Sequence, residues 1–351
     1  MNNWEQYVRK VTPYVPGEQP NSTNMIKLNT NENPYPPSPK VLEALSGFEA
    51  DRLRLYPDPT ASELVQALAD YHGVNPENVF VGVGSDDVLA MSFLTFFNSD
   101  KPILFPDITY SFYDVWAELF RIPYQRPELN ADFSMQLSDY YQENGGIVFP
   151  NPNAPTGLLE SISAIEDILA HNKEVIVIVD EAYIDFGGAT ALPLLQQYEN
   201  LMVVRTFSKS RSLAGMRIGY AIGNAKLIQY LNDAKYSFNS YTMNQTSLAL
   251  GMASVLDQEY FEKTCAQIIE TREWTKQELA SLGFTFPDSK ANFIFASHPD
   301  NPARDLFAAL RKEHIYVRYF DKPRIDNYLR ITIGTKEEMQ ILIDFFKDYM
   351  K

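Results

Sequence analysis

The chain has 351 residues, a formal net charge of -15 at pH 7, 45% hydrophobic residues and one cysteine, Cys265. So acidic a chain would repel an extended phosphate backbone, which argues against a nucleic-acid partner, and one cysteine excludes an internal disulfide and a thiolate zinc site. The four histidines show no ligand spacing, so we expect no metal site. The chain does not open on a signal-peptide pattern, and its longest apolar run, residues 88–97, is too short for a membrane span. We therefore expect a cytoplasmic protein without a membrane partner.

Residues 1–40 are rich in proline and asparagine and are predicted to form an arm that packs with the small domain and with a partner subunit. From residue 41 to about 245, short β-branched runs alternate with helix-length amphipathic stretches. The runs are VFVGV, KPILF, GGIVF, EVIVIVD and LMVVRT. Because they lack polar alternation, they predict strands covered on both faces, and so a large α/β domain with a mostly parallel sheet flanked by helices.

Residues 246–351 predict a smaller α+β domain. A long helical stretch ends at Gly283, the runs FTFP, NFIFAS, IYVRYF and YLRITIG predict strands, and residues 335–338 (TKEE) predict a capping box before a last helix. Ligands of open parallel sheets gather at the carboxyl ends of the strands. The candidate functional residues should therefore follow the strands of the larger domain.

The first such position is the turn at residues 82–84 in VFVGVGSDD, which is followed by a predicted helix near Asp86. Free backbone N–H groups and the positive end of the helix dipole make this turn a natural phosphate site. The alternative is a plain turn in which Ser85 or Asp86 caps the helix. A dinucleotide-binding fingerprint fails, because it needs a third glycine where Asp87 stands.

Asp180 ends the run EVIVIVD, with Tyr183 a short loop away. The acidic strand end of a P-loop NTPase is one interpretation, but its phosphate loop needs a Gly-Lys pair and the chain has none. A carboxylate that stays ionised beside a heterocyclic nitrogen is the second, with Tyr183 as a phenolic donor. An aspartate that only caps the next turn is the third.

Lys209 follows the strand LMVVRT, between Ser208 and Ser210 and eight residues before Arg217. A lone lysine of this kind is more often a surface residue, but a positive, partly buried neighbourhood makes it a usable amine nucleophile. A phosphate cradle, an aspartate for a ring nitrogen and a lysine amine are together the requirements of pyridoxal phosphate. Arg211, equally close in sequence, acquires no role and is expected to be solvated.

Seven motifs in order resemble the histidinol-phosphate aminotransferase group of the fold-type I, pyridoxal-phosphate-dependent aminotransferases. They are KLNTNENPYPPSP, YPDPTASELVQALADYHGV, VGVGSDD, PNPNAPTG, VDEAYIDF, RTFSKSRSLAGMRIGY and LRITIGT. The likeness covers nearly the whole chain. It implies an enzyme of histidine biosynthesis that moves an amino group between histidinol phosphate and 2-oxoglutarate, giving imidazole-acetol phosphate and glutamate.

The resemblance also implies a role for each matching cofactor residue. Lys209 would form the Schiff base and then shuttle the proton at the substrate's α-carbon, Asp180 would pair with the pyridine nitrogen, and Tyr183 would donate to the phenolic oxygen O3′. The remaining cofactor contacts would be ring stacking by Tyr110, phosphate binding by the N–H groups of Ser85 and Asp86 with Ser208 and Arg217, and a phosphate contact by Tyr56 across a homodimer interface.

One loop departs from the family's pattern. The family usually has asparagine before Pro155, where it contacts O3′, whereas this chain has Ala154. Asn153 is the nearest replacement, and the alternative is that Tyr183 alone serves O3′.

Substrate binding is implied for Arg330 in LRITIGT and Arg318 in IYVRYF, with Tyr14 and Asn33 of the arm closing over the site. Two relatives of the same fold remain open as alternatives: an aromatic or broad-specificity aminotransferase, and threonine-phosphate decarboxylase. A catalytically silent cofactor-binding regulator would need an attached DNA-binding module, for which the chain offers neither length nor basic charge.

Overall fold

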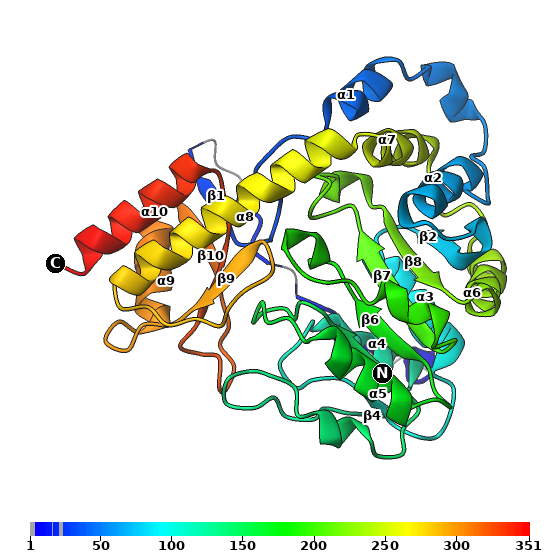
Figure 1. Cartoon of the computed structure of the whole chain (residues 1–351), viewed down its shortest axis with the longest axis horizontal. Coiled ribbons are helices and arrows are strands. Elements are labelled where there is room, and N and C mark those ends of the chain that lie inside the picture. The colour runs from blue at the N-terminus through cyan, green and yellow to red at the C-terminus, as the bar shows by residue number, and fades with distance from the viewer. Residues whose placement is uncertain (1–3, 16, 21–23) are drawn as a thin grey trace.

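The computed structural model describes residues 4–15, 17–20 and 24–351, and these form a larger and a smaller α/β unit (Figure 1). Within these residues the larger unit holds a seven-stranded sheet in the order β2-β8-β7-β6-β5-β3-β4. The strands are β2 (Val79–Gly82), β3 (Ile103–Leu104), β4 (Tyr124–Gln125), β5 (Gly146–Pro150), β6 (Val177–Asp180), β7 (Leu201–Thr206) and β8 (Gly219–Gly223).

The large sheet is mostly parallel, as the sequence predicts. Strands β4, β3, β5, β6 and β7 are parallel neighbours, whereas β8 runs antiparallel to both β7 and β2. The residues of β8 were not among the predicted strands. With glycine at both ends and Ile222 as its one β-branched residue, it gives a weak strand signal, although every residue of the strand is buried.

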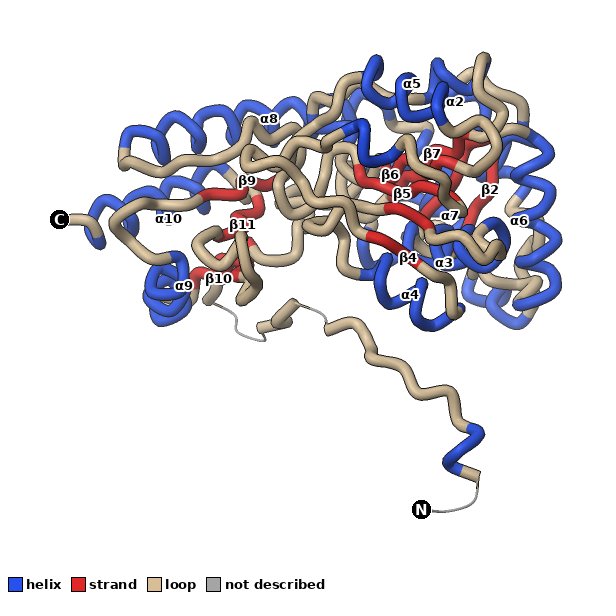
Figure 2. Tube along the Cα trace, turned by 90° about the horizontal axis from the view of Figure 1, so that it is seen from below, coloured by secondary structure: helices blue, strands red, loops and turns tan. Residues whose placement is uncertain are grey.

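Helices cover both faces of this sheet, which explains the uninterrupted apolar runs. Alternate residues of β5, β6 and β7 point to opposite faces: Val148 and Ile178 pack against α3, α4 and α6, whereas Ile147 and Val177 pack against α5. Figure 2 shows α5 on one side of the strands and α3 and α4 on the other. The helices are α1 (Pro39–Ser46), α2 (Ser62–His72), α3 (Ser85–Phe96), α4 (Phe112–Phe120), α5 (Ile162–His171), α6 (Ala225–Phe238), α7 (Gln245–Val255), α8 (Gln258–Ser281), α9 (Ala303–Lys312) and α10 (Lys336–Tyr349).

The smaller unit holds a sheet in the order β1-β10-β11-β9, with β9 at Phe293–Ala296, β10 at Ile315–Tyr319 and β11 at Leu329–Thr332. Its edge strand β1 (Ile26–Leu28) comes from the predicted arm and pairs in parallel with β10. The run FTFP, predicted as a strand, forms only an isolated bridge between Thr285 and Ser297. Thr335 and Glu338 form the predicted capping box at the start of α10.

The candidate functional residues follow the strands of the large sheet, and a segment that leaves the small sheet reaches them. Strand β6 ends at Asp180, Lys209 follows β7 by three residues, and α3 begins directly after β2 and a short glycine turn. Residues 29–33 leave β1 and cross toward the same edge of the large sheet, where Asn33 donates to the Lys209 carbonyl at 3.0 Å. The carboxyl edge of the large sheet therefore faces a chain segment that belongs to the small sheet.

Candidate active site

A cavity of about 250 Å³ lies at the carboxyl ends of β6 and β7, and we call it the Lys209 cavity. Segments far apart in the sequence contribute its walls: the start of α3, the ends of three strands and the loop after β1. The residues predicted for the cofactor that line it are Ser85, Asp86, Tyr110, Asp180, Tyr183, Ser208, Lys209 and Arg217.

Part of the cavity wall is formed by the start of α3 and Arg217. Gly84, at φ +87°, caps α3, and a Cβ at this position would lie 2.5 Å from Nη2 of Arg217. The glycine turn therefore lets the guanidinium approach the free N–H groups of the first helical turn, which neither Ser85 nor Asp86 caps. Arg217 also donates to Oγ of Ser208 at 3.3 Å and to the Asp86 carboxylate at 3.2 Å.

The same cavity is lined by Asp180, which is 4% exposed. Its carboxylate accepts hydrogen bonds from the hydroxyl of Tyr113 at 3.1 Å and from the N–H of Ala182 at 3.2 Å. Burial raises the pKa of Asp180 to about 7 despite these two bonds. In the described part of the chain no basic side chain pairs with Asp180, so a cationic ring nitrogen in the cavity would supply the missing partner.

Lys209 and Tyr183 also line this cavity. The Lys209 amine donates to the carbonyl of Thr30 at 3.2 Å and lies 5.7 Å from the centre of the Tyr183 ring. The Tyr183 hydroxyl accepts a hydrogen bond from the Asn31 amide at 2.9 Å. Tyr110 donates to Asp86 at 2.7 Å from its own side of the cavity. A lysine amine, an anion cradle and an unpaired carboxylate thus share one cavity, which fits pyridoxal phosphate.

A second cavity of about 280 Å³ adjoins the first and shares Tyr110, Tyr183 and Lys209 with it. We call it the Arg330 cavity, because Arg330 and Arg318, which face each other across β11 and β10, both line it. Tyr14 of the arm lines it too and stacks on Phe112 at 4.1 Å.

Arg330 has an unsatisfied hydrogen-bond donor in the Arg330 cavity. It donates to the carbonyl of Asn29 at 3.0 Å, but its Nε is buried without a hydrogen-bond partner among the described residues. Burial lowers the pKa of the Arg330 guanidinium, and neighbouring Arg318 lowers it further. Buried N–H donors are nearly always satisfied in folded proteins, so an unsatisfied one beside a second arginine indicates a place for a carboxylate or phosphate.

Three residues predicted from the resemblance lie outside both cavities. The Tyr56 side chain is 81% exposed and contacts the ring of Tyr241. Asn33 binds the backbone carbonyls of Lys209 and Ser210 instead of lining a wall. The Asn153 amide points away, donating to the Ile108 carbonyl at 3.0 Å and to Thr156 at 3.1 Å. Ala154, which lines both cavities, leaves an apolar surface there.

Arg211 is not solvated as predicted, and two residues of the site, Tyr113 and Asn31, were not predicted. Arg211 is 6% exposed, with its guanidinium over the rings of Tyr71, Phe207 and Phe261, so it is not solvated. The missed residues are Tyr113 and Asn31, the partners of Asp180 and Tyr183. Asn31 lies in the quoted motif NTNENP, whose clustered amides were the available signal.

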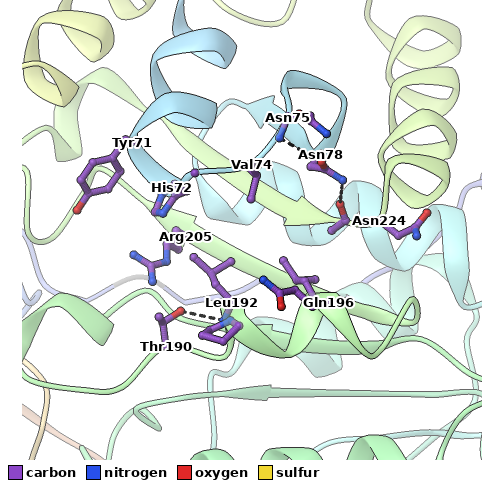
Figure 3. A pocket seen from close by; sticks show the side chains of 14 residues that line it. Tyr71, His72, Val74, Asn75, Asn78, Thr190, Leu192, Gln196, Arg205 and Asn224 are labelled. Carbon is purple, nitrogen blue, oxygen red and sulfur yellow. Dashed lines mark hydrogen bonds between the residues drawn. The ribbon is translucent and has the colours of Figure 1, made fainter.

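A larger cavity of about 750 Å³, the Arg205 cavity, lies between the end of α2 and the loop before β7 (Figure 3). Its charged side chain, Arg205, already pairs with Glu181 at 2.8 Å and with Asp185 at 3.3 Å. His72 contacts the Tyr220 hydroxyl at 3.0 Å, and burial lowers the pKa of His72 to about 3. These groups satisfy one another, so this cavity offers little for chemistry.

Among the described residues, histidine, cysteine, aspartate and glutamate form no cluster that could hold a metal ion. Nor does any helix in this part of the chain have the length and apolar character needed to cross a membrane.

Comparison with known proteins identifies the family. Residues 23–346 match the family model of class I and II aminotransferases. The chain is 54% identical over 349 residues to a histidinol-phosphate aminotransferase of Lactococcus lactis subsp. cremoris (strain MG1363), which covers 99% of this chain and 98% of that protein. It is 52% identical over 344 residues to the protein of the same name from Clostridium botulinum (strain Langeland), with 98% and 97% coverage.

Solved structures share the fold at lower identity. The histidinol-phosphate aminotransferase of Clostridium acetobutylicum superposes with a TM-score of 0.86 at 21% identity, covering 93% of this chain and 99% of its own. The Sinorhizobium meliloti enzyme of that name, in complex with pyridoxal-5'-phosphate, gives 0.83 at 23% identity, with 92% and 91% coverage. By its family model and its relatives over nearly the whole length, the chain belongs to the class I and II aminotransferases.

Proposed function

We propose that this protein is a pyridoxal-phosphate-dependent aminotransferase of histidine biosynthesis. It converts histidinol phosphate and 2-oxoglutarate into imidazole-acetol phosphate and glutamate, and the reverse. The observation that carries the proposal is the buried, unpaired Asp180 in one cavity with Lys209 and Arg217, adjoining the unsatisfied Arg330. Relatives that are more than half identical over nearly the whole chain and bear this enzyme's name support the choice of substrate.

The cofactor, when bound, supplies a ring that accepts the electrons of the substrate's α-carbon. Arg217, Ser208 and the first N–H groups of α3 would hold its phosphate, and Asp180 would pair as a carboxylate with its ring nitrogen. Tyr110 would stack on the ring and Tyr183 would donate to O3′. Lys209 would bind the aldehyde and, once freed by substrate, would carry the proton between the substrate's α-carbon and C4′ of the cofactor.

Arg330 and Arg318 bind the anionic end of each substrate in turn. Histidinol phosphate offers a phosphate and glutamate a carboxylate, and both accept paired hydrogen bonds from a guanidinium. The unsatisfied Nε of Arg330 supports this assignment. Tyr14 and Asn33, which come from the N-terminal part of the chain, exclude water when substrate is bound.

The enzyme works in the cytoplasm as a homodimer. Tyr56 is exposed in the single chain, and Leu53 and Leu55 beside it are also exposed large hydrophobic residues. A second copy that covers this surface would bring Tyr56 to the neighbouring subunit's cofactor phosphate. For Asn153 to contact the cofactor, its amide would have to leave its present acceptors, the Ile108 carbonyl and the Thr156 hydroxyl.

The test has two parts. Borohydride reduction of the holoenzyme should leave a pyridoxyl group on Lys209, located by peptide mass spectrometry, and a Lys209→Arg variant should acquire none. Holoenzyme that has not been treated with borohydride is then mixed separately with histidinol phosphate, phenylalanine and threonine phosphate. We expect histidinol phosphate to convert the cofactor spectrum to that of the amine form fastest. Fast conversion by phenylalanine alone would replace the proposal with an aromatic aminotransferase, and carbon dioxide release from threonine phosphate would replace it with a decarboxylase.

A further inference from the structure

Three consecutive residues after β1, Asn29, Thr30 and Asn31, each contact a different residue of the candidate active site; we call residues 29–31 the strap. The carbonyl of Asn29 accepts from Arg330 and the carbonyl of Thr30 accepts from Lys209. Asn31 differs from the other two, because it uses its side chain, whose amide donates to the Tyr183 hydroxyl at 2.9 Å.

Asn31 is held firmly in this position. It is 1% exposed, and its backbone N–H donates to Oγ1 of Thr332 at 3.0 Å while its carbonyl accepts from Asn292 at 3.1 Å. Its φ of 56° lies in the left-handed region, which asparagine tolerates better than most residues. The side chain therefore has a fixed origin from which to reach Tyr183.

The hydrogen bonds around Asn31 also decide which end of its amide faces Tyr183. The Thr332 hydroxyl already accepts from the Asn31 backbone, so it has its own proton to give, and it donates to Oδ1 of Asn31 at 3.1 Å. The Nδ2 group is thereby left to face Tyr183. Since the tyrosine oxygen is the acceptor in that bond, its own proton is available to another group.

The Lys209 cavity offers the Tyr183 proton a destination. Tyr183 lines that cavity, and at the loop opposite, Ala154 contributes only a methyl group while the Asn153 amide is bound elsewhere. We propose, on the basis of the function proposed above, that Asn31 is a positioning residue: it holds the Tyr183 hydroxyl so that its proton points to O3′ of the cofactor. In this chain the strap thus supplies the support that an amide at position 154 would otherwise give.

This role has a measurable consequence in the bound cofactor. Donation by Tyr183 stabilises negative charge on O3′, and that charge is greatest when the linkage between Lys209 and the cofactor has lost its proton. A weaker donation therefore raises the pH at which the cofactor's visible absorbance changes. Lys209, Arg330 and Tyr110 also face Tyr183, and all three stay unchanged in the variants below.

The experiment is a spectroscopic pH titration of holoenzyme without substrate. Asn31→Gly removes the amide and tolerates the positive φ, and it should raise the midpoint of the absorbance change by about 0.5 to 1 pH unit, as the loss of one hydrogen bond implies. Asn31→Asp keeps the size of the side chain, and therefore its packing, but turns the donor into an acceptor of the Tyr183 proton. It should raise the midpoint at least as far.

Two further variants test whether the effect of Asn31 acts through Tyr183. In a Tyr183→Phe background, Asn31→Gly should cause no additional shift, because its effect runs through the tyrosine. Asn29→Ala is the matched control: it removes an equally buried amide of the strap, whose side chain donates to the Glu18 carbonyl at 2.8 Å, and it should leave the midpoint unchanged.

The inference is overturned if both Asn31 variants titrate like wild type, or if Asn31→Gly shifts the midpoint equally without Tyr183. Failure of the proposed function gives a different result, namely protein that shows no visible cofactor absorbance and no reducible adduct on Lys209. The two failures are therefore distinguishable in one set of samples.

Discussion

A buried arginine, Arg205, and a partly buried one, Arg330, line two different cavities of this molecule, yet their surroundings are opposite. Arg205, in the larger Arg205 cavity, pairs with Glu181 and Asp185. Arg330, in the smaller Arg330 cavity, has no carboxylate partner among the described residues, another arginine across the strand and an unsatisfied Nε. Arg205 is thus neutralised within the fold, whereas Arg330 keeps a hydrogen-bond donor without a protein acceptor.

The comparison shows that cavity size is a poor guide to function here. The Arg205 cavity has about 750 Å³ and the Lys209 cavity about 250 Å³, but unsatisfied charge is found in the smaller one and its neighbour. Polar groups without a protein partner favour ligand binding, whereas polar groups that pair with one another favour the stability of the fold. Substitutions in the two places should therefore affect different measurements.

The largest expected effect is the loss of stability on removing Arg205. Arg205→Met leaves Glu181, a fully buried carboxylate, without its cation, and we expect the free energy of unfolding in urea to fall by about 3–5 kcal/mol. Adding Glu181→Gln should recover part of this loss, because the orphaned charge is then gone. A loss below about 1 kcal/mol would contradict the structural role assigned to Arg205.

Arg330→Met should give the reverse result. We expect KM for histidinol phosphate and for glutamate to rise roughly a hundredfold, the effect of losing hydrogen bonds between charged groups, with the cofactor still bound. The free energy of unfolding should change by less than about 1 kcal/mol, because no carboxylate loses its partner. Arg304→Met, which removes an exposed arginine of the same unit paired with Asp321, is the control and should leave KM unchanged. Equal damage to stability and to KM would contradict the assigned role.

The smallest expected effect concerns the free energy of unfolding of the cofactor-free protein, to which Asp180 and His72 contribute pH dependences of opposite sign. The pKa of Asp180 is raised from 3.8 to about 7, so the folded protein keeps a proton that the unfolded chain has lost, and stability falls as pH rises from about 4 to about 7. The pKa of His72 is lowered from 6.5 to about 3, so stability falls as pH drops below about 6.5.

Each group contributes a slope of up to about 1.4 kcal/mol per pH unit, and in wild type the two partly cancel. Unfolding curves of the Asp180→Asn variant, measured against wild type, should therefore reveal greater loss in acid. Those of His72→Gln should reveal greater loss toward pH 7. The same sign of change in both variants would refute the opposition between the two cavities.

The strand ends were predictable because an apolar run stops at a polar residue. Asp180 and Lys209 both follow such runs, and the parallel sheet brings their ends to one edge. Arg211 was not predictable, since its aromatic neighbours Tyr71 and Phe261 come from α2 and α8, far away in the sequence. A local pattern shows where a strand ends, but not which distant rings will cover the next side chain.

The same limit applies to the loop before Pro155 and to the strap. The sequence offers Asn153 as an amide near the cofactor, but the direction of that amide depends on Ile108 and Thr156. Asn31 was visible as one amide among several in a proline-rich arm. Its contact with Tyr183 depends on β1 joining the small sheet, a pairing that a three-residue strand barely signals.

The position of β1 has a consequence for the order in which the enzyme is made. The backbone of Asn31 is fixed by Thr332, a residue 301 positions later in the chain. During synthesis the strands of the large sheet are complete before β10 and β11 exist. Until then the strap lacks its partners on β11, Thr332 and Arg330. Closing so long a loop comes late in folding. Lys209 and Asp180 can thus be in place on a nascent chain that still lacks Arg330 and in which Asn31 is not yet fixed beside Tyr183. We therefore expect transamination to begin only after β10 and β11 have formed and β1 has paired with β10.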